Sequence, residues 1–221
     1  EVPLPHPGRD RTSGRLWRIV YKGDAAGTKP AKMPPPLVEM PTNKLIEACD
    51  HPTLSYRLRA MEMLIEQACT SCPEEMMAAF PTATSRQKTH LLWGLERMGK
   101  LADEHLTAAA KDDAREVRVH ALKLLSERTD WDEVARKLAA AALQDEDGFV
   151  ARAAADAIGR RPRAEFVSLL LERLQKTPAA DNHLRQVLRM AVRDQLAAAE
   201  DMSKVIPQKL SEADANDIVQ M

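Results

Sequence analysis

Several patterns that mark common protein classes are missing from this 221-residue sequence. No apolar run approaches the roughly 18 residues that a transmembrane helix needs, so we expect no membrane insertion. Lysine plus arginine (32) and aspartate plus glutamate (33) nearly cancel, leaving a net charge of −1. That balance does not supply the positive field that neutralises phosphates, so no nucleic-acid partner is expected. No glycine-rich phosphate-binding loop is present either.

Cysteine is scarce as well, with three copies, two of which have the spacing Cys69-Thr70-Ser71-Cys72. A covalent haem site needs histidine directly after the second cysteine, where this chain has Pro73. A zinc site needs two more ligands of compatible spacing, and a thioredoxin-like site needs a βαβ context. The interpretations left for Cys69 and Cys72 are a local disulfide or two free thiols, with a redox pair least favoured. No cofactor is expected in this segment, and Cys49 should pack as a small hydrophobic residue.

Aromatic residues make up only 4% of the chain, whereas Ala, Leu, Met, Glu, Arg and Lys dominate from Thr42 onward, and these favour helices. The first 41 residues differ, because they hold eight of the 14 prolines, which exclude helix interiors. Within them, residues 14–23 predict one short β-strand. We therefore expect an extended tail with a Pro-rich linker over 1–41, a helical domain over 42–199 and a C-terminal tail over 200–221.

A short sequence motif, called the phrase below, recurs along the helical part. It begins with a hydrophobic or aromatic residue and ends four positions later with alanine. It has clear copies ending at Ala60, Ala121 and Ala154 and a weak copy at 90–95. Ala121 lies 61 residues after Ala60, and Ala154 lies 33 residues after Ala121. The first gap thus holds one more copy, and a repeat of roughly 30 to 35 residues made of two helices is typical of an α-solenoid. In each clear copy a hydrophobic residue follows four positions after the alanine: Leu64, Leu125 and Ile158.

The turns that precede the second helix of each pair are acidic or contain proline, at 50–52, 112–113 and 145–147. Carboxylates at a helix N-terminus accept from its free N–H groups and oppose its dipole. An arginine in the phrase, as in Arg57 and Arg118, can reach an acidic turn of a neighbouring repeat. We interpret these Asp–Arg pairs as structural, with a ligand site as the lesser alternative. The predicted structural positions are Arg57, Ala60, Leu64, Asp112, Arg118, Ala121, Leu125, Asp145, Ala154 and Ile158.

An acidic turn, then a hydrophobic residue followed by Arg-x-x-Ala, then a Leu four later resembles the HEAT repeats of the PBS-lyase type, over about residues 42–199. This resemblance implies an all-α fold, a right-handed α-α superhelix, preceded by an extended tail with one strand. Residues 9–19 and the linker after them resemble the end of the β-propeller in secreted bacterial proteins of the sorbosone or PQQ-dehydrogenase-like type. In those proteins HEAT-like repeats and often a c-type cytochrome follow, which implies a periplasmic or secreted parent whose dehydrogenase and haem functions lie elsewhere.

Three functions remain in view. The first is a non-catalytic spacer or interaction scaffold, with neighbouring domains of the parent chain or another protein as partners and no catalytic residues. The second is an enzyme on a HEAT-like scaffold, bilin-lyase-like or DNA-glycosylase-like, although Trp93 and Trp131 lie on different repeats and predict no aromatic groove. The third is electron transfer, which the missing Cys-x-x-Cys-His opposes. His90 and His120 occupy equivalent positions on second helices, and either a metal pair or partly exposed positions would explain them.

Overall fold

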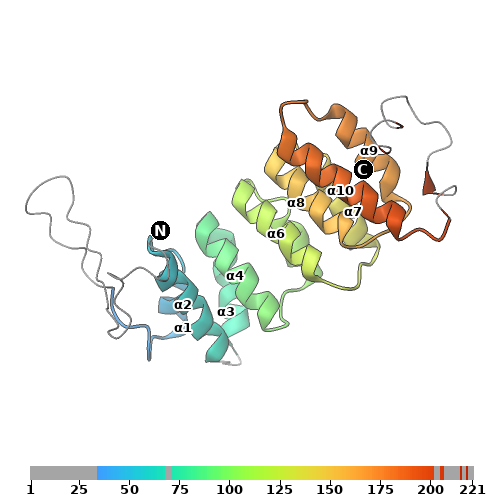
Figure 1. Cartoon of the computed structure of the whole chain (residues 1–221). Helices are drawn as coiled ribbons and strands as arrows, with labels where there is room; N and C mark the ends of the chain where they lie inside the picture. Colours follow the sequence, from blue (N-terminus) through green and yellow to red (C-terminus); the bar gives the residue numbers. More distant parts are fainter. Residues whose placement is uncertain (1–33, 68–70, 202–204, 207–214, 216–217, 219–221) are drawn as a thin grey trace, which may run out of the picture. The chain divides into compact units, whose positions relative to one another are not determined.

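The computed structural model describes residues 34–67, 71–201, 205, 206, 215 and 218. The chain divides into one unit over Glu1–Pro35 and another over Pro36–Met221, and the helices below all belong to the second. The strand predicted over 14–23 and the propeller-like segment 9–19 lie outside the described residues. The described part is all-helical, which confirms the all-α part of the predicted fold (Figure 1).

Ten α-helices and one short 3-10 helix follow one another in the described residues, and the first begins at Thr42. Their bounds are α1 Thr42–Ala48, α2 Leu54–Glu66, α3 Cys72–Ala79, η1 Phe80–Thr82, α4 Ser85–Arg97, α5 Asp103–Ala109, α6 Arg115–Glu127, α7 Glu133–Leu143, α8 Gly148–Gly159, α9 Phe166–Lys176 and α10 Asn182–Ala197. Side-chain caps define several starts. Thr84 and Gln87 form a capping box at α4, and the carboxylates of Asp132, Asp147 and Asp181 accept from the first turns of α7, α8 and α10.

The helices pack in a regular order. Each odd-numbered helix contacts the even-numbered helix that follows it, and the even-numbered helices contact one another in the series α2, α4, α6, α8, α10. Figure 1 shows this series as successive ribbons in chain order. We call α1, α3, α5, α7 and α9 the first helices and the even-numbered ones the second helices. A side chain on the exposed face of one second helix is therefore close to the corresponding side chains of the next.

The small residue of the recurring phrase lies where second helices pack. Ala60, Ala121 and Ala154 are all fully buried, and a side chain of this size lets neighbouring helices approach closely. Gly94 holds this position in α4, where an added Cβ would come within 2.9 Å of the Met76 Cε. The hydrophobic residues four positions later, Leu64, Leu125 and Ile158, are buried to 1% exposure or less. These positions form the core between the helices.

Candidate functional site

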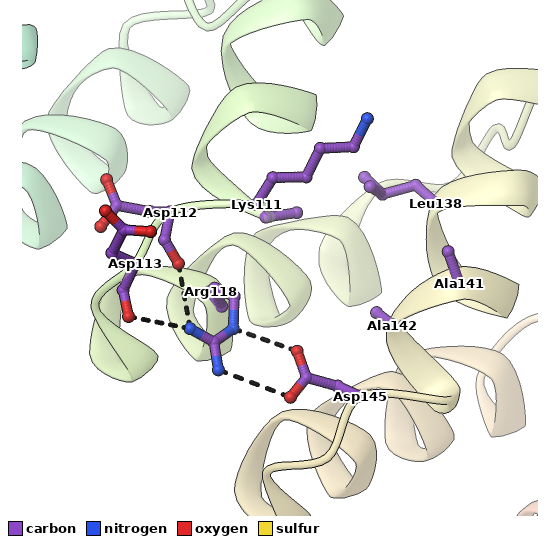
Figure 2. Close-up of a pocket in the computed structure, with 9 residues that line it drawn as sticks. Lys111, Asp112, Asp113, Arg118, Leu138, Ala141, Ala142 and Asp145 are labelled. Carbon is purple, nitrogen blue, oxygen red and sulfur yellow. Dashed lines mark hydrogen bonds and ion pairs between the residues drawn. The ribbon is translucent and has the colours of Figure 1, made fainter.

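Arg118 links two successive turns of the chain. Its Nη1 donates to the backbone carbonyls of Asp112 and Asp113, each at 3.0 Å, in the turn before α6. Its Nε donates to Asp145 Oδ2 at 3.1 Å and its Nη2 to Asp145 Oδ1 at 3.4 Å, in the turn before α8. Figure 2 shows this guanidinium between the two turns, beside a cavity of about 390 Å³. The arginine and the acidic turn expected to meet are thus brought together.

A similar contact joins α4 to the turn before α6. Lys88 Nζ donates to Asp112 Oδ2 at 2.7 Å, and the other carboxylate oxygen accepts from the Ala114 N–H at 2.9 Å. Burial raises the pKa of Asp112, but the Lys88 and Ala114 hydrogen bonds and the nearby cations outweigh it, so this pKa lies below its usual value. Because the donors around this carboxylate are already committed, we interpret the Asp112–Arg118–Asp145 region as a structural joint.

Arg57 repeats only half of this pattern. Its Nη1 donates to the carbonyls of His51 and Pro52 at 2.6 and 3.0 Å, with the same sequence offsets as Arg118. Its Nε, however, donates to His90 Nε2 at 3.1 Å. Within the described residues Arg57 meets no acidic side chain, and Asp50 instead accepts from Thr84 Oγ1 at 2.7 Å. Arg57 therefore contacts a histidine on α4, whereas the Nε of Arg118 contacts an aspartate in the next turn.

The cysteines lie near the start of the domain. Cys72 is buried at the beginning of α3 and is disulfide-bonded. Cys69 lies outside the described residues, so the Cys69–Cys72 pairing stays a prediction. Cys49 is free and buried, and burial raises the pKa of its thiol to about 12. A thiol held in this protonated form is a poor nucleophile, so Cys49 is a packing residue.

A larger cavity of about 860 Å³ extends across the second helices α2, α4 and α6. We call it the central groove. The α2 side is mostly apolar, with Leu54 and Leu58 exposed by 55% and 40% beside Arg57. The α4 side carries Arg86, His90, Trp93 and Arg97, and the α6 side carries Glu116, His120 and Glu127. The groove therefore has an apolar edge, a basic ridge and an acidic edge.

The two histidines of the central groove are both hydrogen-bond acceptors. His90 accepts from Arg57, and His120 Nδ1 accepts from Trp93 Nε1 at 2.9 Å, with the two rings edge to face at 82°. Burial, with Arg57 next in effect, lowers the pKa of His90 to about 4. Burial and Lys123 lower the pKa of His120 as well. Both imidazoles are thus neutral near pH 7.

The central groove was not expected from the sequence, because the tryptophans lie on separate repeats. Trp93 and His120 each stand one residue before the small residue of the phrase, Gly94 or Ala121, whereas His90 stands four before Gly94. The expected equivalence of His90 and His120 is therefore wrong, and the counterpart of His120 is Trp93. Equivalent positions on adjacent second helices share a face, so this register could have brought them together. A metal pair at His90 and His120 was one interpretation of the sequence. The described residues contain no group of three or more His, Cys, Asp or Glu side chains that could hold an ion.

Comparison with protein-family models and with curated proteins finds no match to this chain. The described helices include none that is both long enough and apolar enough to cross a membrane.

The depressed pKa of His90 makes the stability of the domain depend on pH. The folded pKa of about 4 lies below the ordinary value of 6.5, so the unfolded chain binds more protons between these values. We expect the free energy of unfolding to be highest above pH 6.5 and to fall by about 1–2 kcal/mol from His90 as the pH drops towards 4, a figure reduced for partial exposure. Urea titrations at pH 4.5, 5.5 and 7 measure this slope.

The matched variants are His90→Gln and His183→Gln, the second at an exposed histidine of α10. His90→Gln should reduce the pH dependence and leave the part that comes from His120, whereas His183→Gln should leave it as in the wild type. An equal slope in all three proteins would contradict the role given to His90.

Proposed function

We propose that residues 42–199 form a HEAT-like α-solenoid, a right-handed α-α superhelix that serves as a non-catalytic interaction scaffold. Repetition of contacts supports the solenoid. Arg57 and Arg118 hold the carbonyls five and six residues before them. His51, Asp112 and Asp145 each accept from the backbone N–H two residues later. Contacts that recur at equivalent positions are expected when each helix pair is one copy of a repeat.

The observation that carries the binding role is the central groove. It runs over three successive second helices and leaves Leu54 and Leu58 largely exposed beside Trp93. Single exposed apolar side chains are ordinary on protein surfaces, but a contiguous set at a hollow is typical of an interaction site. The polar groups around Arg118 are already hydrogen-bonded to one another, so the proposed binding surface is the central groove.

The scaffold is proposed to serve a larger dehydrogenase-like and haem-binding protein, either within one parent chain or between chains. The support for this part is the resemblance of residues 9–19 to the end of a β-propeller, together with the Pro-rich linker that follows. A scaffold of this kind would orient neighbouring domains, and the chemistry of the parent would take place on them.

Site-specific photo-cross-linking in the cells that produce the protein tests the binding role. A benzophenone amino acid replaces either Leu54 in the central groove or Val134 on the first helix α7, two apolar residues of similar exposure, 55% and 50%. We expect a discrete protein adduct from position 54, identified by mass spectrometry, and little or none from position 134. Adducts of equal yield from both positions, or an adduct to nucleic acid from position 54, would argue against the scaffold.

A further inference from the structure

The two histidines of the central groove present N–H donors. An imidazole that accepts on one nitrogen while neutral carries its proton on the other. Since His90 Nε2 accepts from Arg57, its proton is on Nδ1, and since His120 Nδ1 accepts from Trp93, its proton is on Nε2. In the part of the chain that the structure describes, neither of these N–H groups meets an acceptor. The groove therefore holds two histidine N–H donors that have no acceptor among the described residues.

Two arginines on α4 add further hydrogen-bond donors, which are positively charged, to the groove. Arg86 and Arg97 are both exposed and lie eleven residues apart on one face of the helix, on either side of His90 and Trp93. Arg97 forms no ion pair with any described residue, whereas Arg86 Nη1 donates to the Asp50 carbonyl at 2.9 Å and lies 3.8 Å from an Asp50 carboxylate oxygen. A ligand that carries negative charge would meet the Arg97 guanidinium without displacing an existing ion pair.

The remaining edges of the groove limit what the ligand can be. Leu54 and Leu58 on α2 call for an apolar side chain. Glu116 and Glu127 on α6 repel any negative charge that spreads over the whole groove. A phosphate backbone, with a charge at every unit and no aliphatic groups, fits this pattern poorly. A peptide can place carboxylates and an apolar side chain at different points.

We propose that the central groove binds a peptide segment of a partner protein that carries several carboxylates and at least one aliphatic or aromatic side chain. The carboxylates accept from His90, His120 and Arg97, and the apolar side chain packs on Leu54 and Leu58. This inference rests on the proposed scaffold function and gives its partner a chemical class.

Fluorescence anisotropy with the full chain tests it. The probe is a fluorescein-labelled eight-residue peptide with three glutamates around one leucine and one phenylalanine, and its match replaces the glutamates by glutamines. We expect saturable binding of the acidic peptide and about tenfold weaker binding of its match. Arg97→Gln should weaken binding of the acidic peptide about fivefold to tenfold. Arg163→Gln, at an exposed arginine in the turn before α9, should leave it unchanged.

Circular dichroism of each variant confirms that it is folded before binding is measured. As a second probe of the site, Leu54→Ser should weaken binding of both peptides by a similar factor of about three. Equal affinity for the two peptides, or equal effects of Arg97→Gln and Arg163→Gln, would overturn the proposal. Displacement of the acidic peptide by an unlabelled 12-nucleotide DNA would overturn it in favour of nucleic acid. A dimer in sedimentation that Arg97→Gln dissociates would instead assign the groove to a second copy.

The scaffold function and the acidic class of its partner can be tested separately. If cross-linking at position 54 captures a protein but the acidic peptide does not bind, the scaffold function stands and the acidic class is wrong. If neither result is obtained, the groove is not the binding surface.

Discussion

Leu125→Asp should lower the free energy of unfolding by about 4–5 kcal/mol. Leu125 is 1% exposed in α6, and its carbonyl accepts from the buried Trp131 Nε1 at 3.0 Å. A carboxylate at this position would be removed from water, and Arg128, which lines the same cavity, is already paired with Glu96 and Asp103. The substitution would also leave a cavity where the leucine branched. Urea denaturation followed by circular dichroism measures the loss, and the melting temperature should fall with it.

Val134→Asp is the control for this variant, because it makes the same kind of change at a residue that is 50% exposed in the first turn of α7. There the aspartate stays in water, and its charge opposes the helix dipole, so we expect a change within about 0.5 kcal/mol. An unchanged melting temperature for Leu125→Asp would mean that the repeat register places this residue on the wrong face.

Arg118→Ala should cost about 2–3 kcal/mol, the second largest effect expected in this chain. The substitution removes donors from two backbone carbonyls and from both carboxylate oxygens of Asp145, at side chains that are only 18% and 22% exposed. Arg118→Lys should recover only part of the loss, since one ammonium cannot reproduce the fork that spans both turns. Equilibrium unfolding in urea compares the three proteins.

Arg59 provides the matched comparison. It also donates to carboxylates, those of Glu62 and Glu66 on its own helix, but these side chains are 49% to 55% exposed. Exposed pairs contribute little because water and salt screen them, so Arg59→Ala should cost far less stability than Arg118→Ala. Similar losses for Arg59→Ala and Arg118→Ala would show that the bridge between turns contributes no more than a surface ion pair.

The parts of the fold that the sequence could predict are those fixed by local spacing. The helical class follows from composition and period. The buried places of Ala121 and Leu125 follow from their recurrence in the phrase, because a small residue and a branched residue four positions apart share one helix face. The contact between Arg118 and Asp145 was also expected, since the arginine lies in one copy of the phrase and Asp145 in the acidic turn before the next copy.

The central groove could not be predicted in the same way, because it depends on side chains that lie about 30 residues apart and on the exact facing of three helices. Arg57 illustrates the difficulty: its sequence context matches that of Arg118, yet its forward contact is His90, since the α4 copy of the phrase is degenerate. Trp93 likewise gave no signal as a lone aromatic. Only its place relative to His120 across the helix interface reveals its role.

The contacts of Arg118 also have a direction along the chain. The carbonyls of residues 112 and 113 precede the arginine, whereas Asp145 follows it by 27 residues. During synthesis α6 and its turn emerge from the ribosome first, so the guanidinium can be held in place before its last acceptor exists. Lys88 likewise precedes Asp112, its acceptor, by 24 residues. The helices α4 and α6 thus each hold a cation ready for the turn that is translated next, an arrangement suited to folding in the order of synthesis.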